Sequence, residues 1–210
     1  MTSVTPFAAQ DVRGLLHRPA KASGAGLVLT HGAGANCEAP VLVETARAFS
    51  AAGVVVLRCD LPFRQQRPKG PRPRGSAAAD RAGLRSAVEA MRRIVSGKIF
   101  LGGHSYGGRQ ASLLAAEEPD IASALLLLSY PLHPPNKPLQ LRTEHFPDLR
   151  TRAVFVHGTV DPFGTIPAMK TAIAMIPASH RLIPIEGAGH DLRRGRIDFA
   201  APVAALLEGA

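Results

Sequence analysis

The chain has 210 residues, of which 46% are hydrophobic, and a formal net charge of +9 from 25 Lys and Arg against 16 Asp and Glu. This composition excludes global disorder, because it supplies enough apolar material for one sizeable core. The longest apolar run, within residues 121–128, is far shorter than the ~20 residues that a membrane helix needs. We therefore expect one globular domain spanning residues 1–210 and no association with a membrane.

The N-terminus and the cysteines indicate the compartment. Residues 1–14 carry neither the basic start nor the apolar core of a secretory signal. Cys37 and Cys59 are too few for a disulfide framework, and no His, Cys, Asp or Glu cluster has the spacing of metal ligands. We expect a cytoplasmic protein with two buried thiols, no metal and no cofactor.

Short β-branched and apolar runs alternate with longer segments of helical period along the whole chain. This alternation is typical of βαβ units around a parallel sheet. The predicted strands are residues 12–17, 25–30, 54–59, 98–103, 124–129, 153–158 and 181–186. The predicted helices are residues 38–53, 76–97, 106–118, 166–176 and 197–209.

Residues 103–107, GHSYG, place a single serine between glycines at the point where a predicted strand meets a predicted helix. A strand that turns this sharply into a helix holds the serine in a strained backbone conformation, which side chains two residues away on either side would obstruct. The glycines therefore indicate a nucleophile elbow, with Ser105 exposed for attack. An ordinary glycine-rich turn is the alternative reading of the pentapeptide alone.

A base and an acid follow Ser105 in the order that serine catalysis often uses. Asp161 comes just after the strand at 153–158, and His190 comes just after the strand at 181–186. Because the carboxyl ends of parallel strands meet at one edge of the sheet, all three side chains are expected to converge there. The sequence thus predicts a catalytic triad of Ser105, His190 as general base and Asp161 as its orienting acid.

The glycine-rich turn at 30–36, THGAGAN, follows another strand of the same set. It is positioned to place the backbone N–H of Ala33 beside that of Tyr106, the residue after the serine. Two such donors form an oxyanion hole for a tetrahedral intermediate. A plain strand-to-helix turn is the alternative.

The motifs HGAG, GHSYGG, GTVDPFG and GAGH resemble those of the α/β-hydrolase superfamily over nearly the whole chain. The chain looks most like the small capless group of testis-expressed protein 30 and NSL-complex subunit 3, with dienelactone hydrolases as more distant relatives. The resemblance implies a three-layer α/β-hydrolase fold, with a mostly parallel sheet, helices on both faces and no cap domain. Dienelactone hydrolases carry cysteine at the elbow, so their substrate does not transfer to a chain with serine.

A serine hydrolase that cleaves a carboxylic ester or thioester through an acyl-enzyme is the function we expect. The alternative is a hydrolase-fold interaction module with little or no turnover, because fold alone does not dictate function. Only about 22 residues separate the strands at 124–129 and 153–158, and five of them are proline. We therefore expect an open site without a lid that accepts small, soluble esters.

Most of the positive charge lies between residues 58 and 93, and its densest part is the segment 63–75. This segment has no aromatic residue after Phe63 on which bases would stack, so nucleic-acid binding is not expected. Its cations follow a strand on the edge that carries Ser105. We predict that Arg64 and Arg67 stand at the mouth of the site and favour anionic esters; the alternative is a solvated loop. The candidate cations are Arg64, Arg67, Lys69, Arg72 and Arg74.

Overall fold

The computed structural model describes residues 2–193 and 197–208. Within them, eight strands form one sheet in the order β1-β2-β4-β3-β5-β6-β7-β8. The first two strands run antiparallel to their neighbours, and every other pair is parallel. The strands are β1 Ser3–Ala9, β2 Val12–Arg18, β3 Gly26–Thr30, β4 Val55–Cys59, β5 Ile99–His104, β6 Ala124–Leu128, β7 Ala153–Gly158 and β8 His180–Ile185.

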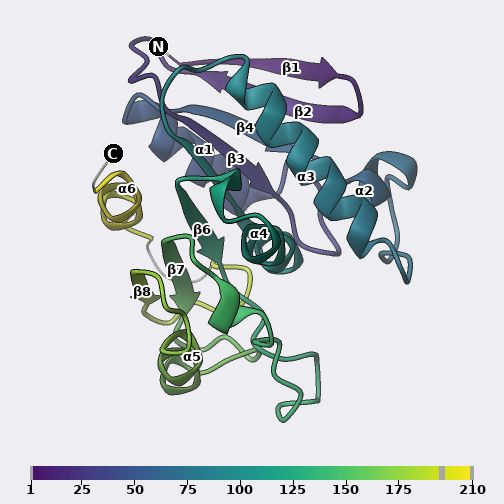
Figure 1. The fold of residues 1–210 in the computed structure, drawn as a ribbon, viewed down its shortest axis with the longest axis vertical. Coiled ribbons are helices and arrows are strands. Elements are labelled where there is room, and N and C mark those ends of the chain that lie inside the picture. The colour runs from purple at the N-terminus through teal and green to yellow at the C-terminus, as the bar shows by residue number, and fades with distance from the viewer. Residues whose placement is uncertain (1, 194–196, 209–210) are drawn as a thin grey trace.

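Helices cover both faces of the sheet, because the inner strands are apolar on both sides. Alternate residues of β5 point to opposite faces: Leu101 packs in the core with α3, α4 and α5, and Phe100 packs in the core with α1 and α6. Figure 1 shows α3 crossing in front of the sheet and α1 behind it. The helices are α1 Pro40–Ala51, α2 Pro62–Gln66, α3 Ala77–Arg92, α4 Tyr106–Glu117, α5 Ile166–Ile173 and α6 Ala200–Leu207. The predicted three-layer α/β architecture is confirmed.

All seven predicted strands are present, with each end within one residue of its prediction. The helix predicted at 76–97 ends earlier, at Arg92, and residue 209 of the last predicted helix lies outside the described residues. One strand and one α-helix were not predicted. Strand β1 is a largely exposed edge strand that contains Pro6, so it shows no hydrophobic pattern, and α2 is a five-residue helix at the start of the basic segment.

The connection between β6 and β7 is short and contains only one 3-10 helix, Phe146–Asp148. No cap domain therefore covers the carboxyl edge of the sheet in residues 129–152. In the described part of the chain, no helix is both long and apolar enough to cross a membrane.

Candidate active site

Ser105 occupies the turn between β5 and α4 in a conformation that few residues adopt. Its φ is +51° and its ψ is −116°, a strained combination for a residue with a side chain. A Cβ atom at Gly103 would lie 2.7 Å from the Thr30 carbonyl oxygen, and one at Gly107 would lie 2.6 Å from that of His31. Glycine is therefore required at both positions for the turn to pack against the end of β3.

The structure brings Ser105, His190 and Asp161 together in one hydrogen-bonded chain. His190 Nε2 lies 2.8 Å from Ser105 Oγ, and His190 Nδ1 lies 2.8 Å from Asp161 Oδ2. An ionised carboxylate only accepts hydrogen bonds, so Nδ1 carries the ring proton and Nε2 accepts from the serine hydroxyl. This tautomer is the one that removes a proton from a nucleophile.

Neighbouring groups fix the orientation of Asp161 and His190. The Asp161 side chain has no exposed surface, and its second oxygen, Oδ1, accepts the N–H of Phe163 at 2.8 Å. The Phe163 ring packs on the His190 ring at 4.4 Å between centroids. His104 Nε2 donates to the His190 carbonyl oxygen at 2.7 Å, and burial lowers the pKa of His104 to about 4, so that its ring stays neutral.

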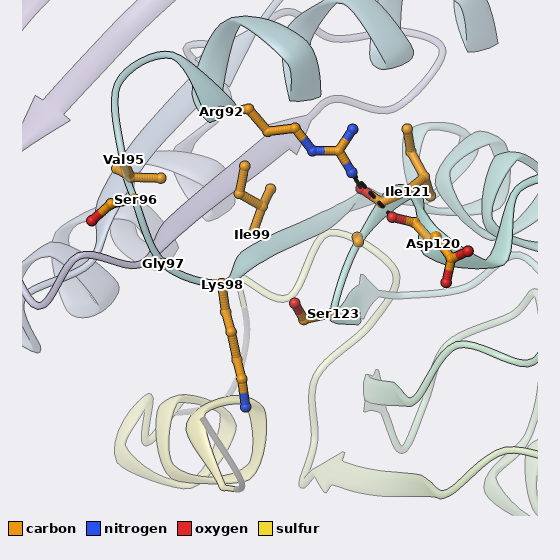
Figure 2. A pocket seen from close by; sticks show the side chains of 10 residues that line it. Arg92, Val95, Ser96, Gly97, Lys98, Ile99, Asp120, Ile121 and Ser123 are labelled. Atoms are coloured by element: carbon orange, nitrogen blue, oxygen red, sulfur yellow. Dashed lines mark hydrogen bonds between the residues drawn. The ribbon is translucent and has the colours of Figure 1, made fainter.

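A pocket of about 220 Å³ opens beside the serine. Its lining residues come from six segments of the chain and are Ala33, Arg72, Ser105, Tyr106, Pro131, Pro135, Arg142, Phe163 and His190. A larger hollow, of about 340 Å³, lies at the opposite edge, where β5 and β6 begin; Figure 2 shows Arg92 beside Asp120 and Ile121 there. Only the first pocket contains the serine and the histidine.

No group of three or more His, Cys, Asp or Glu side chains that would hold a metal ion occurs within residues 2–193 and 197–208.

Comparison with known proteins identifies the family. Residues 23–200 match the family described as "Alpha/beta hydrolase domain". The chain belongs to this family. The match includes Ser105, Asp161 and His190, so the family assignment covers the part of the chain that holds the candidate site.

Solved structures show the same fold at low sequence identity. A lidless α/β serine hydrolase from Xanthomonas campestris aligns with a TM-score of 0.76 at 15% identity, covering 99% of this chain and 94% of that one. A dienelactone hydrolase from Anabaena variabilis aligns with a TM-score of 0.71 at 20% identity, over 99% and 94% of the two chains. Est1E from Butyrivibrio proteoclasticus, with ferulic acid bound, aligns at 0.75 and 18% identity, over 98% and 97%.

The backbone donors predicted for the oxyanion lie at this α/β-hydrolase's pocket. Ala33 and Tyr106 both line it, and Tyr106 is the first residue of α4, where helix N–H groups have no intrahelical acceptor. In the described part of the chain, neither N–H donates to another group of the protein.

Arg64 does not lie at the mouth of the pocket, where the sequence analysis predicted it. Its side chain is buried with 4% exposure, because α2 turns it beneath the turn that follows β3. Nη2 donates to the Ala33 carbonyl at 2.9 Å, and Nε donates to the Ala35 carbonyl at 2.8 Å. Arg64 is therefore an anchor of the candidate oxyanion turn and not a surface cation. Arg67 is exposed and does not line the pocket either.

This anchoring predicts a role for Arg64 in turnover. We expect Arg64→Gln to lower kcat about tenfold with a smaller change in KM, since a loosened turn misplaces the Ala33 N–H by a fraction of an ångström. Steady-state kinetics on a soluble ester, measured at least 20 °C below the melting temperature of the variant, separate this effect from unfolding.

Arg152→Gln is the matched control. Arg152 donates to the carbonyls of Ala205 and Leu206 at 2.6 and 2.5 Å, so its loss also removes two guanidinium–carbonyl bonds, but far from the pocket. We expect it to lower the melting temperature and keep kcat. An equal fall of kcat in both variants would contradict the positioning role of Arg64.

Other titratable groups near this edge are buried or hydrogen-bonded to neighbouring backbone groups. The ring of His31 accepts the Leu61 N–H at Nε2 and donates to the Gly32 carbonyl, and burial lowers its pKa. Burial raises the pKa of the Cys37 thiol to about 12, and the same cause raises that of Cys59. Asp60, which follows β4, accepts the Cys37 N–H at 2.7 Å and thereby shapes the turn.

Proposed function

We propose that this α/β-hydrolase is a serine hydrolase that cleaves a carboxylic ester or thioester through an acyl-enzyme. The observation that carries the proposal is the hydrogen-bonded chain from Asp161 through His190 to Ser105, with the serine held in a strained elbow at the floor of a pocket. Nucleophile, base and orienting group within hydrogen-bond reach form the arrangement that activates a serine.

The reaction proceeds in two halves. Ser105 Oγ attacks the carbonyl carbon as His190 Nε2 takes the hydroxyl proton, and the oxygen of the tetrahedral intermediate accepts from the N–H groups of Ala33 and Tyr106. Collapse breaks the ester C–O or thioester C–S bond, and the protonated imidazole gives its proton to the leaving group. A water molecule, deprotonated by His190, then attacks the acyl carbon and releases the acid and Ser105.

We also propose that the chain works as one α/β-hydrolase domain of the capless group that includes testis-expressed protein 30 and NSL-complex subunit 3. The absence of a folded lid in residues 129–152 supports it. A pocket of about 220 Å³ is smaller than the ~300 Å³ or more of typical sites for drug-sized molecules, which supports short acyl groups.

Fluorophosphonate labelling tests the nucleophile. Trypsin releases residues 99–109 between Lys98 and Arg109, and Ser105 is the only serine in that peptide. We expect the phosphonate adduct on this peptide from folded protein and its absence from heat-denatured protein. If folded protein carries no adduct there, the chain is not an active serine hydrolase, and the interaction-module alternative is favoured.

A further inference from the structure

Two arginines from distant segments line the pocket that contains Ser105. Arg72 comes from the loop between α2 and α3, and Arg142 comes from the connection between β6 and β7. Neither guanidinium pairs with a carboxylate among the residues that the structure describes. Nearby Arg109, in contrast, is paired with Glu144 at 2.6 Å.

Neutral groups hold Arg72 in place, and it forms no direct ion pair among the residues that the structure describes. Its Cζ stands 4.5 Å from the centroid of the Tyr106 ring, and Nη1 donates to Ser76 Oγ at 3.0 Å. Ser76 and the Tyr106 hydroxyl both donate to Asp80 Oδ2, at 2.8 and 2.7 Å. This network fixes the guanidinium against Tyr106, the residue that supplies one of the two oxyanion donors.

Arg142 is half-buried and completes the positive lining. Its backbone is anchored, because its N–H donates to the Leu132 carbonyl and its carbonyl accepts the Tyr130 hydroxyl at 2.6 Å. Burial is the main cause that lowers the pKa of Arg142, and repulsion from Arg109 and, more weakly, from Arg72 adds to it. An anion between the two arginines would offset both the burial and the repulsion.

We propose that the pocket selects esters or thioesters whose short acyl group ends in a carboxylate, which Arg72 and Arg142 bind while Ser105 attacks the carbonyl at the other end. This inference rests on the proposed function and names its substrate class. Guanidinium groups bind carboxylates through charge-assisted, often bidentate hydrogen bonds, which also orient the bound group.

The size of the pocket limits the length of the acyl group. A volume of about 220 Å³ is several times the ~30 Å³ that one water molecule occupies in the liquid, so the pocket accommodates a small acyl group. A succinyl group, with four carbons and three oxygens, has this size. Half-esters of short dicarboxylic acids are thus the class that fits both the charge and the volume.

Two esters of nearly equal shape test the proposal. Ethyl hydrogen succinate ends in a carboxylate, and ethyl 4-oxopentanoate replaces that carboxylate by a neutral methyl ketone. We expect kcat/KM to be at least about tenfold higher for the succinate, the contribution of one charge-assisted hydrogen bond or more. The half-ester of decanedioic acid should lose this advantage, because its acyl group exceeds the pocket.

Arginine variants test which side chains produce the preference for the succinate ester. The ratio of the two kcat/KM values should fall to about one in the Arg72→Gln/Arg142→Gln double variant and to an intermediate value in Arg72→Lys/Arg142→Lys, which keeps the charges without the planar fork. Arg74→Gln is the control: Arg74 is exposed in the same loop and does not line the pocket, so the ratio should persist. A ratio of one in the wild type, or a ratio unchanged in the double Gln variant, would overturn the proposal.

A binding measurement separates this inference from the proposed function. Calorimetry of succinate with the Ser105→Ala variant should show binding that disappears when Arg72 and Arg142 are also changed to Gln. If neutral esters are hydrolysed through Ser105 without preference for the succinate, only the charge selection is wrong. If succinate binds but no ester is hydrolysed, the anion pocket stands and the proposed hydrolysis is wrong.

Discussion

Ser105→Ala is expected to lower kcat for a short ester by about 10⁵- to 10⁶-fold, the loss typical of removing a serine nucleophile. The remaining rate would come from the pocket and the two backbone donors, which still bind the substrate and its oxyanion. The variant should keep its fold, since the elbow is held by the Ser105 N–H bond to the Leu128 carbonyl at 2.8 Å and by the flanking glycines, none of which the hydroxyl provides.

Ser129→Ala is the matched control for this loss. Ser129 follows β6, the strand next to β5, it also has a positive φ of 47°, and its buried hydroxyl has no hydrogen-bond partner in the described residues. Its removal should leave kcat within about twofold of the wild type. Wild-type turnover by Ser105→Ala, with circular dichroism showing an intact fold in both variants, would remove Ser105 as the nucleophile.

The proximity of Ser105, Asp161 and His190 could be predicted from the sequence because it depends mainly on the topology of the sheet. Each follows a strand, and parallel strands place their carboxyl ends at one edge whatever the details of packing. The apolar runs that mark β5 and β7 are strong, since almost all of their residues are buried, whereas β8 is largely exposed or half-buried and carries a weaker signal. Strand β1 is exposed and has no such apolar run, so it was not predicted.

The residues around the acid and in the pocket were harder to predict, because loops carry no periodicity. Arg64 was predicted at the mouth of the site, and the short helix α2, which the sequence did not predict, explains why it is buried against Ala33. Arg142 and Phe163 lie in irregular segments whose paths depend on tertiary contacts. The sequence offered one signal for Phe163. It stands two residues after Asp161, the spacing at which an aspartate side chain often accepts a backbone N–H.

Asp161→Asn is expected to lower kcat about 10⁴-fold while leaving the fold intact. Asparagine has the same shape, and the Phe163 N–H requires an oxygen at the position of Oδ1. The amide nitrogen must therefore face His190 Nδ1, where it can only donate. His190 would then carry its proton on Nε2, and Nε2 would no longer accept the proton of Ser105.

Asp191→Asn is the control for this argument, because the Asp191 carboxylate directly follows His190 in sequence. It is exposed, and its Oδ1 accepts the Arg193 N–H at 3.1 Å, so it has no contact that sets the tautomer of His190. Kinetics of both variants on one ester, with the Nδ1 and Nε2 protons of His190 assigned by nitrogen NMR, measure cause and effect together. We expect the proton to move to Nε2 in Asp161→Asn alone; a comparable loss of kcat in Asp191→Asn, or an unchanged tautomer in Asp161→Asn, would show that another group orients the base.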